Sequence, residues 1–198
     1  MRPAVLEDGH RLRARIFIHL VRALSRQRID PVVQMAMYRP RFFGDPFFIL
    51  GPEVLRGPSY WTPAEREYLA VFTSRLNECP FCVRMHTETT RVESGGMIDV
   101  KDSGSMRPEV AAILPLLEKV TRTPDQVASA DVDAVRAAGV PDEGIVDALH
   151  VNLIFNIMNR LANAFDFSWD SEEQVRVGAK VIHRISYRLP RVLTASRT

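Results

Sequence analysis

The chain has 198 residues, of which 46% are apolar and 25% are charged, and its formal net charge is +2. A chain of this length buries roughly 70% of the surface that it exposes when unfolded, and this composition is not that of a disordered protein. The two cysteines, Cys79 and Cys82, stand three residues apart, which excludes a secreted scaffold held by several disulfides. The pair is therefore redox-active, metal-binding or inert.

Basic residues are concentrated in the first part of the chain. Residues 1–60 hold ten arginines and five acidic residues, whereas residues 61–198 hold 16 basic and 19 acidic residues. No zinc-finger, RNA-recognition or aromatic-interleaved basic pattern accompanies them, so we expect no nucleic-acid partner. Apolar stretches such as 16–24 are short and interrupted by His19 and Arg22, so we expect no membrane insertion. Without a recognisable signal peptide, we expect a cytoplasmic protein.

The N-terminal extension, residues 1–38, is expected to contain an amphipathic helix over about 10–27. Apolar residues recur there every four positions among arginines, at Leu12, Ile16, Leu20 and Leu24. This spacing marks one face of a helix. We expect the face to pack in the core or against another subunit, and the alternative is that it lies on an anionic membrane.

Seven prolines and glycines then punctuate residues 39–62, which predicts an irregular, aromatic-rich linker. A helical unit follows over residues 63–96. Thr-Pro-Ala-Glu at 62–65 is a capping box with proline at the first helical position, so a helix should run to about residue 77. Pro80 suits the first position of a second helix, which places Cys79 near the N-cap of that helix.

The second helical half, residues 108–189, follows a Gly- and Ser-rich loop over 94–107. Its pattern predicts four helices, at about 108–121, 131–138, 142–165 and 171–189. No segment alternates with period two for long enough to form a strand. The sequence therefore predicts a single all-α domain, a multihelical bundle spanning 1–198.

A weak internal repeat relates the two halves. Pro-x-Glu begins a predicted helix at Pro63 and again, with an offset of 78 residues, at Pro141. At this offset Cys79 aligns with Ile157 and Cys82 with Arg160, so the second copy lacks cysteines. The repeat indicates either a duplicated helical unit or simply a common way to start a helix.

The residues that carry chemistry lie on the second helix of the 63–96 unit. Cys79, Cys82 and His86 follow at spacings of three and four, which places their side chains on one helical face. Backbone N–H groups and the dipole at a helix N-terminus favour thiolate, so at least one thiol pKa should be lowered. Such a thiol can attack a peroxide, and the second can condense with the resulting sulfenic acid to a disulfide. The imidazole can accept the thiol proton.

Two alternatives compete with this interpretation. Cys79, Cys82 and His86, with His150 or His183 as a fourth ligand, could form a structural zinc site. The cysteines could also be two inert buried residues. Asn156, Asn159 and Arg160 could line the same site, but we expect them to hydrogen-bond between helices instead.

The sequence resembles the alkylhydroperoxidase D-like (AhpD-like) family of the carboxymuconolactone decarboxylase superfamily. The similarity lies in residues 54–59, 65–67, 74–77 and 79–86. The later stretches at 117–124, 133–139 and 155–164 are similar to the peroxidase-related branch of that superfamily. Together these stretches extend over about residues 38–167 and imply an AhpD-like helical fold.

The family motif is a glutamate twelve residues before the first cysteine of Cys-x-x-Cys, then a histidine four residues after the second. Glu67, Cys79, Cys82 and His86 fill these positions here. The resemblance implies that Cys82 is the peroxidatic thiol and Cys79 the resolving thiol. It implies that Glu67 and His86 form a proton relay.

One residue departs from the pattern of some members, which carry a histidine between the two cysteines. Phe81 stands at that position. We expect slower proton transfer, or a bulkier and more apolar peroxide, with Phe81 lining the entrance for an organic substrate. The decarboxylase branch generally works without the cysteine pair, so lactone decarboxylation is disfavoured.

The predicted function is thus that of an antioxidant, thiol-dependent peroxidase of the peroxiredoxin type that reduces hydrogen peroxide or organic hydroperoxides, with no metal or other cofactor. Its partners would be a hydroperoxide substrate and an external dithiol reductant. The family also implies a homo-oligomer, a dimer, trimer or hexamer, to which the N-terminal helix could contribute. The alternatives are a redox-sensing or scaffold protein of the same fold and a structural zinc site.

Overall fold

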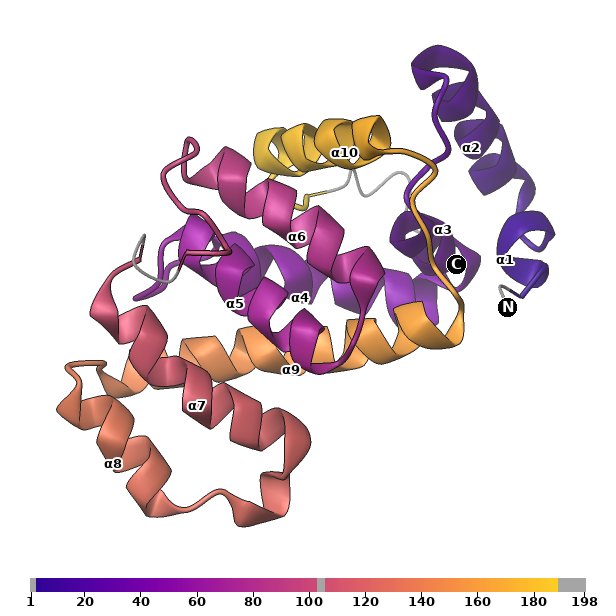
Figure 1. Ribbon diagram of the computed structural model, residues 1–198. Coiled ribbons are helices and arrows are strands. Elements are labelled where there is room, and N and C mark those ends of the chain that lie inside the picture. Colours follow the sequence, from indigo (N-terminus) through magenta and orange to yellow (C-terminus); the bar gives the residue numbers. More distant parts are fainter. Residues whose placement is uncertain (1–2, 103–105, 189–198) are drawn as a thin grey trace.

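The computed structural model describes residues 3–102 and 106–188, and the secondary structure of these residues is helical without strands (Figure 1). The all-α prediction is confirmed. The helices of the 63–96 unit and of the second half begin within about two residues of their predicted starts. The last helix, α10 (Glu172–Ile185), ends earlier than predicted, and residue 189 lies outside the described residues.

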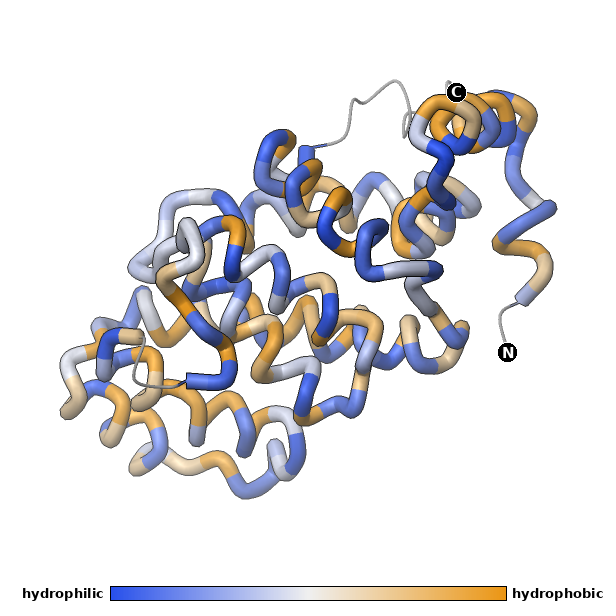
Figure 2. The backbone as a smooth tube through the Cα atoms, turned by 45° about the horizontal axis from the view of Figure 1, so that its top comes forward, coloured by the Kyte–Doolittle hydropathy of each residue, from blue (hydrophilic) through white to orange (hydrophobic). Residues whose placement is uncertain are grey.

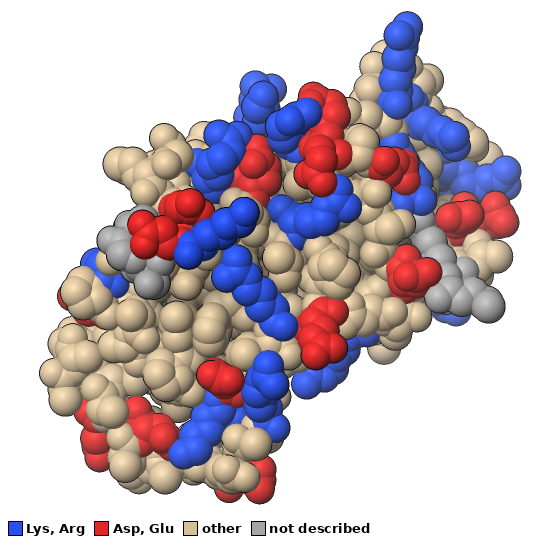
Figure 3. Space-filling model, in the orientation of Figure 1, with Lys and Arg blue, Asp and Glu red and all other residues tan. Residues whose placement is uncertain are grey.

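The N-terminal extension forms α1 (Val5–Asp8), α2 (Leu12–Ser25) and α3 (Pro31–Tyr38), and α2 projects from the body of the molecule (Figure 1). No residue of α2 is buried. The predicted apolar stripe exists, but in the single chain it faces solvent, with Leu24 86% exposed. Apolar and polar positions alternate along α2 in Figure 2, and Figure 3 shows basic side chains on the visible face of this projecting region.

The prediction of an irregular linker over 39–62 is wrong. A π-helix, η1 (Pro40–Gly44), runs directly into α4 (Asp45–Arg56), and only the residues after Arg56 are irregular. The prolines lie where helices accept them: Pro40 begins η1, where the missing N–H would be unpaired anyway, and Pro46 stands at the second position of α4. Pro52 lies inside α4, so one hydrogen bond is lost there.

The glycine at the end of η1 has a packing reason. A Cβ at Gly44 would lie 2.5 Å from the carbonyl oxygen of Ala36, so glycine is what allows η1 to approach α3. The rings of Phe43 and Phe47 stack with centroids 5.3 Å apart. Gly44 therefore serves close helix packing instead of chain irregularity.

The centre of the molecule is an α-hairpin on a long helix. α5 (Pro63–Leu76) and α6 (Pro80–Glu93) pack together, α9 (Asp142–Ala164) crosses beneath them, and α10 covers α6 (Figure 1). α7 (Pro108–Arg122), η3 (Pro124–Gln126) and α8 (Ser129–Ala137) complete the other end. Thr62 and Glu65 form the predicted capping box. Leu69, Ala70 and Val71 of α5 are fully buried, so α5 is the core helix.

Candidate active site

The site begins at the break between α5 and α6. Glu78 has a left-handed backbone (φ 50°), which is unfavourable for a residue with a Cβ, and Cys79 follows as the N-cap of α6. The side-chain amide of Asn163, on α9, donates to the carbonyl of Asn77 at 3.0 Å and so supports the break. The chain thus stops one helix and starts another at the cysteines.

Both thiols are free and buried, with exposures of 1% for Cys79 and 3% for Cys82. A hydrogen bond from Cys82 lowers the pKa of the Cys79 thiol to about 7 against the opposing effect of burial. The same hydrogen bond, together with burial, raises the pKa of Cys82 well above its ordinary value. When the pair holds one proton, the thiolate is therefore favoured on Cys79 and the proton on Cys82.

Asn159 of α9 is a further contact of the thiols. It is fully buried, donates to Ser74 Oγ at 3.0 Å and accepts from Asn77 Nδ2 at 3.2 Å. Its amide also hydrogen-bonds to the sulfurs and favours thiolate, so it contributes to the lowered pKa of Cys79 and opposes the rise in the pKa of Cys82. Asn159 does bond between helices as expected, but the sequence carries no signal for its contact with sulfur.

An apolar cavity of about 180 Å³ lies beside α6. Cys82 and His86 form part of its wall, whereas Cys79 does not line it. Phe81 also lines it, and the Phe81 ring stacks on Trp169 with centroids 4.3 Å apart. Most of the remaining wall is aliphatic or aromatic, so a molecule in the cavity would meet Cys82 before Cys79.

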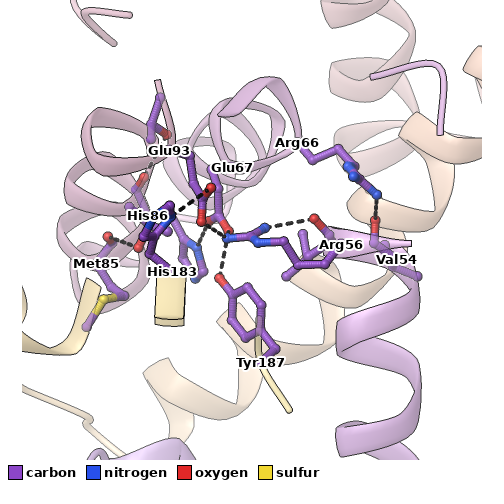
Figure 4. Close-up of polar contacts among 12 residues, drawn as sticks. Val54, Arg56, Arg66, Glu67, Met85, His86, Glu93, His183 and Tyr187 are labelled. Carbon is purple, nitrogen blue, oxygen red and sulfur yellow. Dashed lines mark hydrogen bonds and ion pairs between the residues drawn. The ribbon is translucent and has the colours of Figure 1, made fainter. Parts of the chain in front are cut away.

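Glu67 lies behind His86 and is completely buried. Its Oε2 is 2.6 Å from Nδ1 of His86, and its Oε1 accepts from Arg56 Nη2 at 2.6 Å and from the Tyr187 hydroxyl at 2.8 Å (Figure 4). Burial acts to raise the pKa of Glu67. The hydrogen bond with His86, together with the positive charge of Arg56, outweighs burial and holds the pKa below its ordinary value.

The sequence did not indicate the outer part of this cluster. Arg56 also donates to Glu93 at 2.8 Å, and His183 Nδ1 lies 3.2 Å from the other oxygen of Glu93 (Figure 4). Arg56 ends α4, in the segment predicted to be a linker, and Tyr187 follows the last helix. Arg56 lies in the 54–59 stretch that carries the family resemblance, but outside the Glu–Cys–Cys–His motif, and Tyr187 lies outside both. Both residues reach the site through tertiary packing.

The zinc alternative finds no ligand set among residues 3–102 and 106–188. No three His, Cys, Asp or Glu side chains there are grouped so that they could hold a metal ion. Of the two candidate fourth ligands, His183 bonds to Glu93 and His150 lines a different pocket with Asp147. The structure instead pairs Glu67 with His86 and Cys79 with Cys82, and Cys82 and His86 line one cavity that includes neither of these histidines.

No protein-family profile and no curated protein matches the sequence. Solved structures do match the fold. An uncharacterized peroxidase-related protein from Silicibacter sp. TM1040 superposes with a TM-score of 0.68 at 22% identity, over 85% of this chain and 91% of its own. The AhpD core of an uncharacterized peroxidase-related protein from Ralstonia eutropha JMP134 superposes with a TM-score of 0.69 at 23% identity, over 92% of this chain and 93% of its own.

This chain has the AhpD-like fold. The fold that the sequence motif implied is therefore confirmed, and both neighbours carry the peroxidase-related description of the branch that the later stretches resemble. The AhpD-like fold sets a helix break and a buried Glu–His pair side by side in this molecule.

Proposed function

We propose that this AhpD-like protein is a thiol-dependent peroxidase that reduces organic hydroperoxides. The observation that carries the proposal is the arrangement around the cavity. Cys82 and His86 line the cavity wall. Cys79, which does not line the cavity, is hydrogen-bonded to Cys82, and Glu67 is hydrogen-bonded to Nδ1 of His86. This arrangement offers an attacking thiol, a second thiol and a proton acceptor in one enclosed place.

The first step oxidises Cys82. Because Nδ1 of His86 is held by Glu67, Nε2 is the nitrogen left to accept the Cys82 proton. The sulfur then attacks the peroxide, an S–O bond forms and the O–O bond breaks. The alkoxide leaves as an alcohol by taking the proton from His86. Cys82 becomes a sulfenic acid, and the peroxide has gained two electrons.

The second step forms the disulfide. The Cys79 thiolate, favoured by backbone N–H groups at the start of α6, attacks the sulfenic sulfur, and the leaving hydroxide is protonated to water. An external dithiol then reduces the Cys79–Cys82 disulfide by thiol–disulfide exchange and supplies the two electrons. We place the protein in the cytoplasm, where such dithiols are kept reduced.

The cavity wall supports an apolar substrate. A cavity of about 150 Å³ lined by apolar side chains is known to accept benzene, and this one is about 180 Å³. Phe81 occupies the place of the second histidine, so the wall next to Cys82 is aromatic instead of polar. We therefore propose compact organic hydroperoxides, such as cumene hydroperoxide, as better substrates than hydrogen peroxide.

The exposed stripe of α2 supports self-association. Its four apolar residues, Leu12, Ile16, Leu20 and Leu24, are each more than half exposed in the single chain. Burying such a stripe is favourable, and we propose that it packs in a homo-oligomer, a dimer, trimer or hexamer.

The peroxidase proposal is tested by stopped-flow mixing of reduced protein with cumene hydroperoxide while free thiols are counted. Fast loss of both thiols is expected, and Cys82→Ser should abolish it. Cys79→Ser should still react but stop at the sulfenic acid. Slow loss in the wild type would favour a redox sensor or scaffold. Stoichiometric zinc that protects the thiols until it is chelated would contradict the proposal.

A further inference from the structure

The chain turns back sharply after α10. Ser186 and Tyr187 both have left-handed backbones, with φ of 51° and 61°. Neither is glycine, and two such residues in succession are unfavourable for L-amino acids. Conformations of this kind persist where surrounding contacts hold them, and they cluster at functional sites.

Tyr187 reaches the buried cluster from outside every element of the sequence motif. Its hydroxyl donates to Glu67 Oε1 at 2.8 Å, and the Arg56 guanidinium lies over its ring at 4.9 Å (Figure 4). The ring also lines the cavity together with Cys82 and His86. Burial, followed by the negative charge of Glu67, raises the pKa of Tyr187 well above its ordinary value, so the phenol remains a hydrogen-bond donor.

The two donors on Glu67 Oε1 are not equivalent. Arg56 donates from one nitrogen, Nη2, to two carboxylates, Glu67 at 2.6 Å and Glu93 at 2.8 Å. Glu93 in turn lies 3.2 Å from His183, an exposed side chain whose charge depends on pH. Tyr187 instead gives its hydroxyl to Glu67. The phenol thus fixes the carboxylate in a way that does not depend on the outer charges.

We propose that Tyr187 is a positioning residue for the Glu67–His86 pair: it holds Oε1 of Glu67 so that Oε2 stays on Nδ1 of His86. The inference rests on the proposed function, because it assigns Tyr187 to the proton relay of that reaction. The left-handed turn is then the means by which the end of α10 delivers the phenol. Tyr187 would act through Glu67 without touching the reacting atoms.

This role has a pH signature. The groups that face Glu67 are Arg56 from α4, Arg66 from its own helix, His86 from α6 and Tyr187, with Glu93 and His183 beyond Arg56. A hydrogen bond to a carboxylate favours its ionised form. Without the phenol, the pKa of Glu67 rises, and the relay loses the carboxylate at a higher pH as the solution is acidified.

The test compares Tyr187→Phe with wild type. The variant keeps the ring against Arg56 and in the cavity wall, and removes only the oxygen. We expect cumene hydroperoxide to oxidise the thiols about tenfold more slowly near neutral pH, with the deficit growing towards pH 5. Tyr60→Phe is the control, because its ring packs on Arg107 outside the cluster. An equal deficit at every pH, or no deficit, would overturn the proposal.

A second measurement separates this inference from the peroxidase proposal. The Glu67 carboxyl carbon is titrated by NMR in protein with labelled glutamate and assigned with Glu67→Gln. Its midpoint should move upward in Tyr187→Phe, and an unmoved midpoint would refute the positioning role even if peroxide proves not to be the substrate. In the Glu67→Gln background, Tyr187→Phe should slow thiol oxidation no further. A full additional tenfold loss there would contradict coupling through Glu67.

Discussion

The α5–α6 hairpin and α9 start alike and then differ. Both α5 and α9 begin at or directly after a proline, with an offset of 78 residues between Pro63 and Pro141. The first unit stops at Leu76 and restarts at Pro80, whereas α9 continues for 23 residues without interruption. The positions that align with Cys79 and Cys82, Ile157 and Arg160, lie in the middle of that continuous helix and are exposed.

The difference shows what a helix break provides. It creates a new N-terminus whose unpaired N–H groups favour thiolate. A continuous helix has no such groups at the equivalent place and offers only side chains. α9 uses them to complete the same site, with Phe155 and Met158 in the cavity wall and Asn159 on the thiols. One unit supplies the reactive groups, and the other supplies the surroundings.

The largest effect on thiol oxidation should come from removing the buried carboxylate of Glu67 on α5. Glu67→Gln should slow thiol oxidation by cumene hydroperoxide about 100-fold at neutral pH, since the relay loses its carboxylate. It should also lower the free energy of unfolding by about 3 kcal/mol, because Arg56 loses a buried ionic partner. Stopped-flow and urea unfolding measure the two effects. Glu88→Gln, which alters a contact with Arg91 at the surface, is the control. An unchanged oxidation rate would refute the relay.

The effect of α9 on the thiol pKa values can be removed without changing Glu67. Asn159→Ala takes away an amide that favours thiolate, so the pKa of the pair should rise by about one unit, the equivalent of one charge-assisted hydrogen bond. The ultraviolet absorbance of the thiolate, followed against pH, measures the shift. Asn156→Ala, one turn earlier in the same polar network, should leave the titration in place. Equal shifts in both variants would show that α9 acts on packing alone.

The pH dependence of alkylation by iodoacetamide examines the coupling of the two thiols. The pKa of Cys79 is lowered, so its reactivity should be full above about pH 7 and disappear as the pH falls through that value. Cys82→Ala removes the donor and should move the midpoint upward. A midpoint near 9 in the wild type, or one that stays near 7 in Cys82→Ala, would contradict the hydrogen bond between the thiols.

The smallest effect concerns the backbone at the break. Glu78→Gly relieves the left-handed strain and should stabilise the protein by about 1 kcal/mol with oxidation rates nearly unchanged. The same substitution at the aligned position of α9, Asn156→Gly, should destabilise it by at least about 1 kcal/mol. Urea unfolding of the two variants measures both effects. Changes of the same sign would mean that the break is not a strained feature of the fold.

Local signals predicted most of the helices and placed Cys79, Cys82 and His86 near the start of one of them. The capping box at Thr62 and the proline after Cys79 locate two helix starts, and the spacing of Cys79, Cys82 and His86 requires only one helix. The prediction of an irregular linker over 39–62 failed because prolines of this segment occupy the first helical turns and one interior helical position. Proline density cannot distinguish these places from a loop without the packing partners.

The supporting part of the site was beyond prediction for a different reason. Arg56, Asn159 and Tyr187 come from the end of α4, the middle of α9 and the turn after α10. Each reaches the cluster through tertiary packing, which periodicity and caps do not encode. In the sequence, Arg56 fell in a predicted linker and Tyr187 within the last predicted helix, so neither was expected to reach this cluster.

The central claim, that Cys79 and Cys82 act as one two-electron centre, is tested most directly by titrating the reduced protein with cumene hydroperoxide under single-turnover conditions. The products are identified by thiol counting and mass spectrometry of the peptides. One equivalent of peroxide should consume both thiols and yield one equivalent of cumyl alcohol and an intramolecular Cys79–Cys82 disulfide. Consumption of peroxide with both thiols retained, or a stable sulfenic acid on Cys82 with Cys79 still free, would contradict the account.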